Sequence, residues 1–563
     1  MSFDPRWFLV VAVSLVFISW ILPGHYYPWA TAYQDFLCFV AVLCLMPVLF
    51  RGGCFRAPRV AVLFIILIFV PLFQYLFGVV YFFGDALVAA AYLAVFAFAF
   101  VVMYSISFDV FLRDFFLRIF AWALVVCSLL SVYIALRQWL LFSGSIWIDD
   151  VHLGGRPFAN LAQPNNLATL LCMGLAGVIF IYEKCYVGRL AGVFLSLFIL
   201  LGIALTQSRT PWVGAVVLGG YWGWKSFSCR LRLSFLVFFG WVLVYVVLIF
   251  SLPLVAELLL LGGSGPLERA QSIERWDMWI QFWHAIWLGP LWGYGWNQVS
   301  VAQVAVSLVY PVPIFTEHSH NIILDIMLWN GPVLGGLVVL TFLSWLINLA
   351  WLARSSEALF SMLVVAFVLV HAMLEFPLEY AFFLVPVGLL LGVVASECHV
   401  GNDFFISRKI LVAIFFSAVI LLSWVGFEYK VIEEDHRLMR FESAGVGSLK
   451  AAQAAPDVRL LTNLREFLRL ARTPDAVTMT SEELEVMRKI VYRYPYVPSL
   501  ARYALALAFN GQPKAARRQL LILRALHGDS VYVEIRDSLQ AVSARYPELT
   551  LVLQGLPKSV PVE

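Results

Sequence analysis

Two histidines separated by one serine, His318 and His320, lie where a long polar stretch meets an apolar run, and Asn321 follows them. An imidazole that is neutral near pH 7 is well suited to act as a general base. Two histidines at positions i and i+2 could also bind a metal ion from an extended strand. No cluster of carboxylates accompanies them, so we expect no metal and no cofactor. A third interpretation is an interfacial pair without a chemical role. We favour a general base, and either histidine could be it.

Arg209 is a candidate for binding a phosphate group. It lies in the short segment 206–212 between two apolar runs. The guanidinium group presents a fork of donors that matches a phosphate or a diphosphate. An arginine at a membrane interface can instead extend its charged end toward water without any further role. The side of the membrane on which Arg209 lies decides between these two interpretations.

The segment 155–166 is rich in amide side chains, among them Asn160, Gln163 and Asn165. Amides offer uncharged hydrogen-bond donors and acceptors, which suit ligands rich in hydroxyl groups. The segment also ends where an apolar run begins, and asparagine is a common helix cap. The sequence leaves both interpretations open, a binding segment and a capped loop that enters a helix.

Apolar runs must position these polar groups. A run of about 18 or more apolar residues can cross a membrane as a helix. The chain has thirteen candidate runs, at about 7–23, 34–50, 60–80, 84–104, 115–137, 166–182, 190–206, 211–225, 233–260, 321–353, 358–375, 379–396 and 409–428.

The basic residues predict the orientation of these spans, because Lys and Arg are enriched in cytoplasmic loops. With a cytoplasmic N-terminus, every inner loop is basic, from Arg51 in the first to Lys409 in the last. Thirteen crossings then place the C-terminal part outside, together with two long loops at about 138–165 and 261–320. Arg209 also lies outside, against the general bias, and this favours a functional role for its charge.

Composition excludes several classes of protein. The 563 residues are 62% hydrophobic and 13% charged, with a net charge of +3, whereas about a quarter of the residues are charged in ordinary soluble proteins. This argues against a cytosolic enzyme and against a nucleic-acid partner. Charge is concentrated at the end of the chain, with 34 charged residues among the 135 from Tyr429 onward. We predict an all-α polytopic membrane protein with about 13 transmembrane helices, divided into a membrane domain at 1–428 and a soluble helical domain at 429–563.

The soluble domain has the pattern of packed helices. Thr480 and Glu483 form the sequence signature of a capping box. Residues 500–509 and 514–526, joined by a turn, predict a helical hairpin that resembles one tetratricopeptide-like unit. A single unit cannot bury its own apolar face, so helices at about 455–472, 481–493 and 530–546 must complete it. The domain could stabilise the outer loops or could form a docking surface for an acceptor protein.

Together, the outer groups suit transfer from a lipid-linked diphosphate donor. The leaving group of such a donor is already activated, so a base and charge stabilisation suffice. The pair of carboxylates that glycosidases use is not evident in the sequence. A transporter or lipid flippase is the alternative from a different class. Its site would lie near the middle of the membrane on interrupted helices, whereas the polar groups here cluster at the outer surface.

Several motifs resemble one superfamily of glycan-transferring membrane enzymes. The segment 155–166 is similar to the signature of PglL-type protein O-oligosaccharyltransferases. His320 and Asn321, followed after nine residues by Gly331, resemble the motif that O-antigen ligases and O-antigen polymerases share. That motif has a second glycine three residues after the first. This chain has Leu334 there, with Gly335 beside it, which is a departure from the pattern.

Other parts of the chain extend the resemblance. Ser208–Arg209, Arg275–Trp276 and the run 290–296 also fit the ligase pattern, and the C-terminal part is similar to the second domain of the PglL branch. The matches cover most of the chain from about 150 to 550. The amide-rich segment and the soluble domain favour a protein acceptor over the acceptors of an O-antigen ligase or an O-antigen polymerase.

The resemblance implies an enzyme of the bacterial inner membrane whose site and C-terminal domain face the periplasm. Such enzymes move glycan from undecaprenyl pyrophosphate to Ser or Thr of pilin or other exported proteins. By the same resemblance, His320 is the essential histidine, with His318 as the alternative. The expected partners are this lipid-linked glycan, a protein acceptor and membrane lipid. The residues expected to bind the substrates are Arg209, Arg275, Gln163, Asn160, Asn165 and Asn321.

Overall fold

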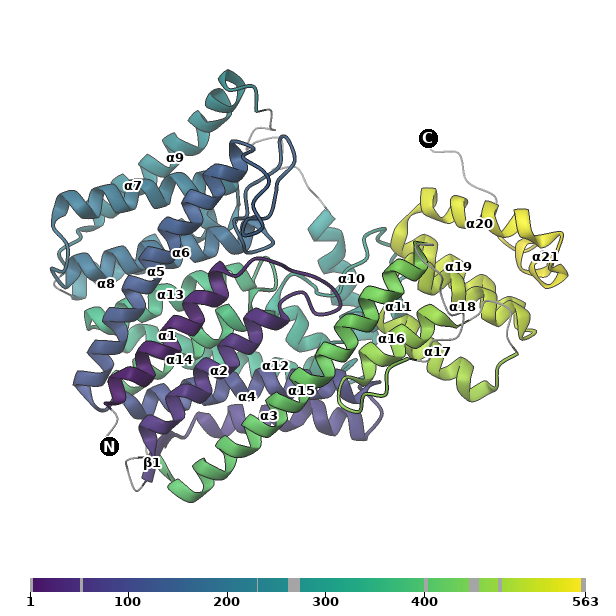
Figure 1. Ribbon diagram of the computed structural model, residues 1–563, viewed down its shortest axis with the longest axis horizontal. Helices are drawn as coiled ribbons and strands as arrows, with labels where there is room; N and C mark the ends of the chain where they lie inside the picture. Colours follow the sequence, from purple (N-terminus) through teal and green to yellow (C-terminus); the bar gives the residue numbers. More distant parts are fainter. Residues whose placement is uncertain are drawn as a thin grey trace. The chain divides into compact units, whose positions relative to one another are not determined.

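The computed structural model describes residues 4–50, 54–229, 231–261, 274–398, 403–444, 455–473 and 478–557. Within these ranges almost all regular structure is helical (Figure 1), so the prediction of an all-α protein is confirmed. Contacts group the chain into two compact units. The first unit comprises Met1–Ile68, Ala91–Gln271 and Phe342–Ser423, and the second comprises Phe69–Ala90, Ser272–Thr341 and Trp424–Glu563.

Each of the thirteen predicted apolar runs coincides with a helix. These helices are α1 (Pro5–Ile21), α2 (Ala32–Leu49), α3 (Ala61–Leu76), α4 (Phe83–Ile106), α5 (Val110–Trp139), α6 (Pro164–Glu183), α7 (Arg189–Thr206), α8 (Thr210–Ser228), α9 (Phe235–Leu258), α12 (Ile322–Leu352), α13 (Ser356–Ala372), α14 (Ala381–Cys398) and α15 (Arg408–Ser443). Among the described helices, nine of these are long and apolar enough to cross a membrane, and α1, α3 and α13 are apolar helices of 16 or 17 residues. The remaining helix, α8, has 19 residues and is not among the nine. The chain is a polytopic α-helical membrane protein.

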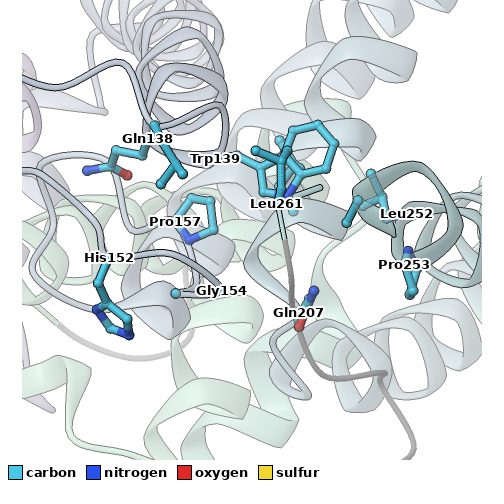
Figure 2. Close-up of a pocket in the computed structure, with 13 residues that line it drawn as sticks. Gln138, Trp139, His152, Gly154, Pro157, Gln207, Leu252, Pro253 and Leu261 are labelled. Atoms are coloured by element: carbon cyan, nitrogen blue, oxygen red, sulfur yellow. The ribbon is translucent and has the colours of Figure 1, made fainter. Parts of the chain in front are cut away.

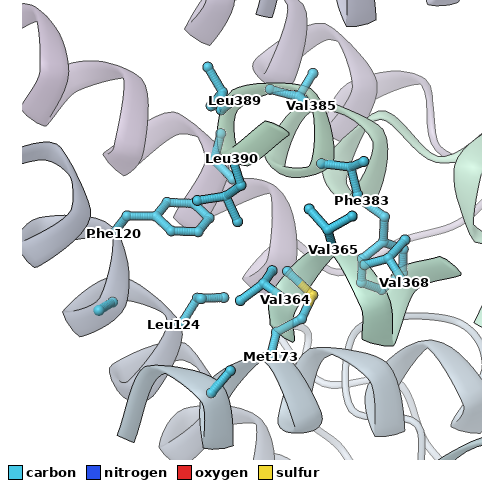
Figure 3. Packing of buried hydrophobic residues seen from close by; sticks show 14 of the residues in the cluster. Phe120, Leu124, Met173, Val364, Val365, Val368, Phe383, Val385, Leu389 and Leu390 are labelled. Carbon is cyan, nitrogen blue, oxygen red and sulfur yellow. The ribbon is translucent and has the colours of Figure 1, made fainter. Parts of the chain in front are cut away.

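Apolar side chains pack between the helices of the first unit. Figure 3 shows Phe120 and Leu124 of α5, Met173 of α6 and Val364 of α13 converging with side chains of α14. A Cβ atom on Gly174 of α6 would lie 2.0 Å from the Ser128 Oγ atom of α5. A side chain as small as glycine is therefore required where these two helices approach each other.

A two-stranded antiparallel sheet is the exception to the helical prediction. Strand β1 (Cys54–Pro58) pairs with β2 (Asp403–Ser407), with Cys54 opposite Ser407 and Pro58 opposite Asp403. Each strand has only five residues and its partner lies far away in the sequence. Neither strand alone carries a pattern that predicts such a pair.

The second unit contains the C-terminal helices. They are α16 (Thr462–Arg472), α17 (Ser481–Arg493), α18 (Val497–Phe509), α19 (Pro513–His527), α20 (Asp529–Ser543) and α21 (Pro547–Leu553). The capping box is confirmed, because Glu483 N donates to Thr480 Oγ1 (3.2 Å) and Thr480 N donates to Glu483 Oε2 (2.8 Å). The predicted hairpin is formed by α18 and α19, whose facing side chains join one core.

The predicted boundary at residue 428 falls inside a helix, because α15 continues through it from Arg408 to Ser443. The predicted loop 261–320 also contains two helices, α10 (Glu274–Leu288) and α11 (Val299–Val306). Residues 262–273 of that loop lie outside the described residues. The second unit combines the C-terminal helices and the last part of α15 with the end of α3, the start of α4, α10, α11 and most of α12.

His527, at the end of α19, predicts a pH dependence of stability. Its Nε2 atom donates to the Pro495 carbonyl oxygen (2.8 Å). Burial nevertheless lowers the pKa of His527 below its ordinary value. The unfolded chain therefore binds a proton at a higher pH than the folded protein does. The neutral side chain of His527 therefore favours the folded protein. This contribution to the free energy of unfolding is fully present above about pH 6.5 and is lost as the pH falls through the lowered pKa.

We expect the variant His527→Gln to reduce the loss of stability between pH 7.5 and pH 5.5. The measurement is the thermal unfolding midpoint of the detergent-solubilised protein at both pH values. His152→Gln is the control, because the His152 side chain is exposed, and its pH dependence should match that of the wild type. An unchanged pH dependence in His527→Gln would contradict the prediction.

Candidate functional site

Arg209 lies in a tight turn of the first unit, between α7 and α8. Gln207 ends α7 with a left-handed backbone conformation (φ 47°). Two hydrogen bonds then fix the turn, from Ser208 N to Thr206 Oγ1 (3.2 Å) and from Thr210 N to Ser208 Oγ (3.3 Å). The residue Arg209 itself is exposed, whereas Ser208 is buried. A rigid, buried turn thus presents an exposed guanidinium group.

Asn165 supports this turn from the start of α6. Its Oδ1 atom accepts hydrogen bonds from Ser208 Oγ (2.7 Å) and Arg156 Nη2 (3.3 Å), and its Nδ2 atom donates to Glu375 Oε1 (3.0 Å). Arg156 Nε also donates to the Thr206 carbonyl oxygen (2.7 Å). The predicted binding residue Asn165 is therefore the centre of a network that holds the segment carrying Arg209.

The other two predicted amides occupy different environments. Asn160 is buried, and its Nδ2 atom donates to the carbonyl oxygens of Ile21 (2.7 Å) and Trp147 (2.9 Å). Both of its N–H groups are thus used to hold the loop. Gln163 is the N-cap residue of α6, and its side chain forms no capping bond with the described residues of that helix. Gln163 is half-buried and is the better placed of the two to meet a ligand.

A pocket lies beside the arginine turn (Figure 2). It is lined by Gln138, Trp139, Leu141, His152, Gly154, Gly155, Pro157, Leu205, Gln207, Leu252, Pro253, Ala256 and Leu261. Most of these side chains are apolar, and they come from α5, α7, α9 and the loop before α6. The Gln207 Oε1 atom is buried and has no hydrogen-bond partner among the described residues. The pocket therefore combines apolar and polar lining residues, and one of them, Gln207, lies two residues from Arg209.

The two histidines lie in the second unit on the segment before α12, which we call the histidine segment (residues 315–321). Asn321 Oδ1 accepts from Ile323 N (3.0 Å) and Leu324 N (3.3 Å) and so caps α12. Ser319 is buried, and its N–H donates to Asp325 Oδ1 (2.9 Å). His318 and His320 are half-buried. His320 has a left-handed backbone (φ 56°), which is uncommon for a residue with a side chain.

Arg275 lies on α10, which is joined to the histidine segment. Trp279 Nε1 of α10 donates to the Ser319 carbonyl oxygen (2.9 Å). Arg275 precedes Trp279 by four residues and therefore lies on the same face of the helix. The structure thus places Arg275 on the face of α10 that contacts the histidine segment.

The predicted motif glycine, Gly331, divides α12 by a kink. Its φ of 76° is non-helical, and a Cβ atom there would lie 1.9 Å from the Leu291 carbonyl oxygen. Gly335 also approaches the backbone closely, because its Cβ atom would lie 2.8 Å from the Ile326 carbonyl oxygen. Leu334 is 41% exposed. The small residue that the fold requires is Gly335, so the departure from the motif at Leu334 is compatible with the turn.

Sequence reasoning missed several polar residues of the first unit. Glu375 and His371 are buried at the end of α13, where His371 Nδ1 lies 2.9 Å from Thr169 Oγ1. An ionisable residue at the end of an apolar run is itself a sign of function, and this signal could have identified both. Throughout the described ranges, no three His, Cys, Asp or Glu side chains are grouped as ligands for a metal ion would be.

Comparison with known proteins identifies the family. Residues 194–340 match the family model described as O-antigen ligase, and residues 359–539 match the C-terminal model of virulence factor membrane-bound polymerases. The class is therefore that of membrane-bound glycosyltransferases related to O-antigen ligases. The chain is 30% identical over 531 residues to the general O-oligosaccharyltransferase of Acinetobacter baylyi, covering 92% of each protein. It is 26% identical over 433 residues to the ComP-specific O-oligosaccharyltransferase of the same species, covering 76% of this chain and 78% of the relative. The chain belongs to the PglL-type O-oligosaccharyltransferases.

Proposed function

We propose that the protein transfers a glycan en bloc from undecaprenyl pyrophosphate to a Ser or Thr hydroxyl of pilin or another exported protein. The observation that carries this proposal is the similarity to an O-oligosaccharyltransferase over 92% of both chains. The basic inner loops support a site that faces the periplasm, in the inner membrane of a bacterium. In this orientation, the donor lipid lies in the membrane and the acceptor comes from the aqueous side.

In the proposed mechanism, the guanidinium groups of Arg209 and Arg275 bind the diphosphate of the donor. His320 takes the proton of the acceptor hydroxyl, and the hydroxyl oxygen attacks the anomeric carbon of the first sugar. The bond between this carbon and the phosphate oxygen breaks, and the lipid diphosphate leaves with the electron pair. The arginines stabilise the charge that develops on the leaving group. A single displacement of this kind inverts the anomeric configuration.

Ser319, which precedes His320, donates its N–H to Asp325 Oδ1 (2.9 Å), and this bond supports a fixed position for the proposed base. Gln163 is proposed to contact the substrates directly. Asn160 and Asn165 are proposed to act indirectly, by holding the loop and the arginine turn, and Asn321 by capping α12.

Reconstitution with defined components tests the proposed function. We expect the purified protein in liposomes, given undecaprenyl pyrophosphate-linked glycan and pilin, to produce pilin heavier by one intact glycan. The mass of the acceptor is the measurement. Transfer should continue in EDTA, because no step of the proposed reaction requires a metal ion.

Four outcomes would contradict the proposal or one of its parts. Transfer to lipid A-core instead of protein would indicate an O-antigen ligase, and elongation of the lipid-linked glycan would indicate a polymerase. Movement of the donor across the membrane without covalent transfer would indicate a transporter. Loss of activity in EDTA that Mg²⁺ restores would refute metal independence.

A further inference from the structure

The C-terminal helices contact the histidine segment at Phe315. Its ring packs edge-on against Tyr496 (5.5 Å between ring centroids) and lies near His527 (5.8 Å). Tyr496 is the N-cap residue of α18, and His527 ends α19. The beginning of the histidine segment therefore packs on the helical hairpin of the C-terminal part, all within the second unit.

Glu317, the residue directly before His318, is also bound by the C-terminal helices. The Tyr496 hydroxyl donates to Glu317 Oε1 (2.5 Å), and Arg493 Nη1 lies 3.8 Å from Glu317 Oε2. One hydrogen bond and one ion pair thus hold a side chain that is only three residues before His320.

Arg493 is itself held by a buried carboxylate. Its Nη2 atom lies 3.1 Å from Asp85 Oδ1, and its Nε atom lies 3.2 Å from both Asp85 oxygens. Asp85 is 1% exposed. A fork of donors on a planar carboxylate has little freedom to move. Arg493 therefore presents a fixed positive charge to Glu317.

The other end of the histidine segment is held independently of the C-terminal helices. Asn321 caps α12, Ser319 N donates to Asp325 Oδ1 (2.9 Å), and Ser319 O accepts from Trp279 (2.9 Å). His320 lies between Ser319 and Asn321, and its backbone is left-handed (φ 56°). Such a conformation persists only where its surroundings fix it.

We propose that the C-terminal helices position His320 for transfer by way of Glu317, with Tyr496 and Arg493 as positioning residues. The inference rests on the role proposed above for His320. This positioning role differs from the two roles considered above for the C-terminal part, which are stabilisation of the outer loops and docking of an acceptor protein. It differs because the contact acts on the proposed base itself. Tyr496 and Arg493 touch neither the donor nor the acceptor in this proposal.

The test compares kcat and KM of Tyr496→Phe and Glu317→Ala with those of the wild type. Tyr496→Phe removes only the hydroxyl and retains the ring that packs on Phe315. We expect kcat to fall by about 10-fold to 100-fold in each variant, the range that a small misplacement of a catalytic group produces. KM for donor and acceptor and the thermal unfolding midpoint should stay near the wild-type values. Tyr532→Phe is the matched control, because the Tyr532 hydroxyl donates to the Pro557 carbonyl oxygen (3.2 Å), away from the histidine segment.

A double variant shows whether Tyr496 acts through Glu317. If it does, Tyr496→Phe combined with Glu317→Ala lowers kcat no further than Glu317→Ala alone. The inference would be overturned if the fold decrease in kcat of the double variant equalled the product of the two single decreases. A wild-type kcat in Tyr496→Phe would overturn it as well. A loss that follows a lowered unfolding midpoint would also overturn it, in favour of a purely structural contact. His320→Ala is measured in parallel, and full activity in that variant would refute the proposed role of His320 as the base instead.

Discussion

Replacing His320 by alanine should lower the rate of glycan transfer by at least about 100-fold and by up to about 10,000-fold, which is the usual contribution of a general base. Without the imidazole, the acceptor hydroxyl keeps its proton and is a weak nucleophile. The measurement is single-turnover transfer from the lipid-linked donor to the acceptor protein. Donor binding should persist, because the arginines that bind the diphosphate remain.

A second variant separates chemistry from backbone strain. His320 has a left-handed backbone (φ 56°), which asparagine tolerates better than alanine does. His320→Asn therefore preserves the conformation but cannot accept the proton, and it should be as inactive as His320→Ala. His318→Ala is the matched control, and it should retain most of the activity. The reverse result, with His318 essential and His320 dispensable, would transfer the role of the base to His318.

Replacing Gly331 by alanine should destabilise the second unit severely. The backbone at Gly331 has φ 76°, and the new Cβ atom would lie 1.9 Å from the Leu291 carbonyl oxygen and 2.8 Å from Gly293 N. Backbone atoms cannot yield as a flexible side chain does. The chain just after these atoms is also held by hydrogen bonds, from Tyr294 N to Leu328 O (2.8 Å) and from Gly295 N to Trp329 O (3.1 Å). Strain and overpacking together should cost about 2–5 kcal/mol of unfolding free energy.

The matched control lies five residues further along the same helix. Apart from its chain neighbours and its own helix backbone, a Cβ atom at Gly336 would meet no atom of the described residues within 4 Å, and alanine is about 1 kcal/mol better than glycine in a helix. Gly336→Ala should therefore be neutral or slightly stabilising. Thermal unfolding of both variants in detergent provides the comparison. A Gly331→Ala protein that melts like the Gly336→Ala protein would contradict the structural role of the kink.

Much of the fold could be predicted from local patterns. Runs of apolar residues predicted thirteen helices, because a membrane span must satisfy its own backbone hydrogen bonds and expose apolar side chains. Thr480 and Glu483 predicted the start of α17, because a capping box involves only four consecutive residues. Residues 500–526 also predicted the α18–α19 hairpin. The apolar periodicity of each helix and the turn between the helices all lie within this short stretch of sequence.

Features that depend on distant residues could not be predicted in this way. The pairing of β1 with β2 joins Cys54 to Ser407, and nothing near either residue indicates the other. The kink at Gly331 depends on the approach of the chain at Leu291. Asn165 and Asn160 were predicted as binding amides from their type alone. Their actual partners, which include Glu375 and Ile21, lie far away in the sequence.

The sequence by itself determined the class of protein, the helices, the family and the residue types of the site, because these follow from composition, periodicity and short motifs. Only the tertiary structure decided which of the polar residues support others and which face outward. Glu317, Tyr496, Arg493 and Asp85 come from three distant parts of the chain, and their contacts exist only after folding. A hydrogen bond or an ion pair depends on distance in space, and local sequence does not encode that distance for residues so far apart.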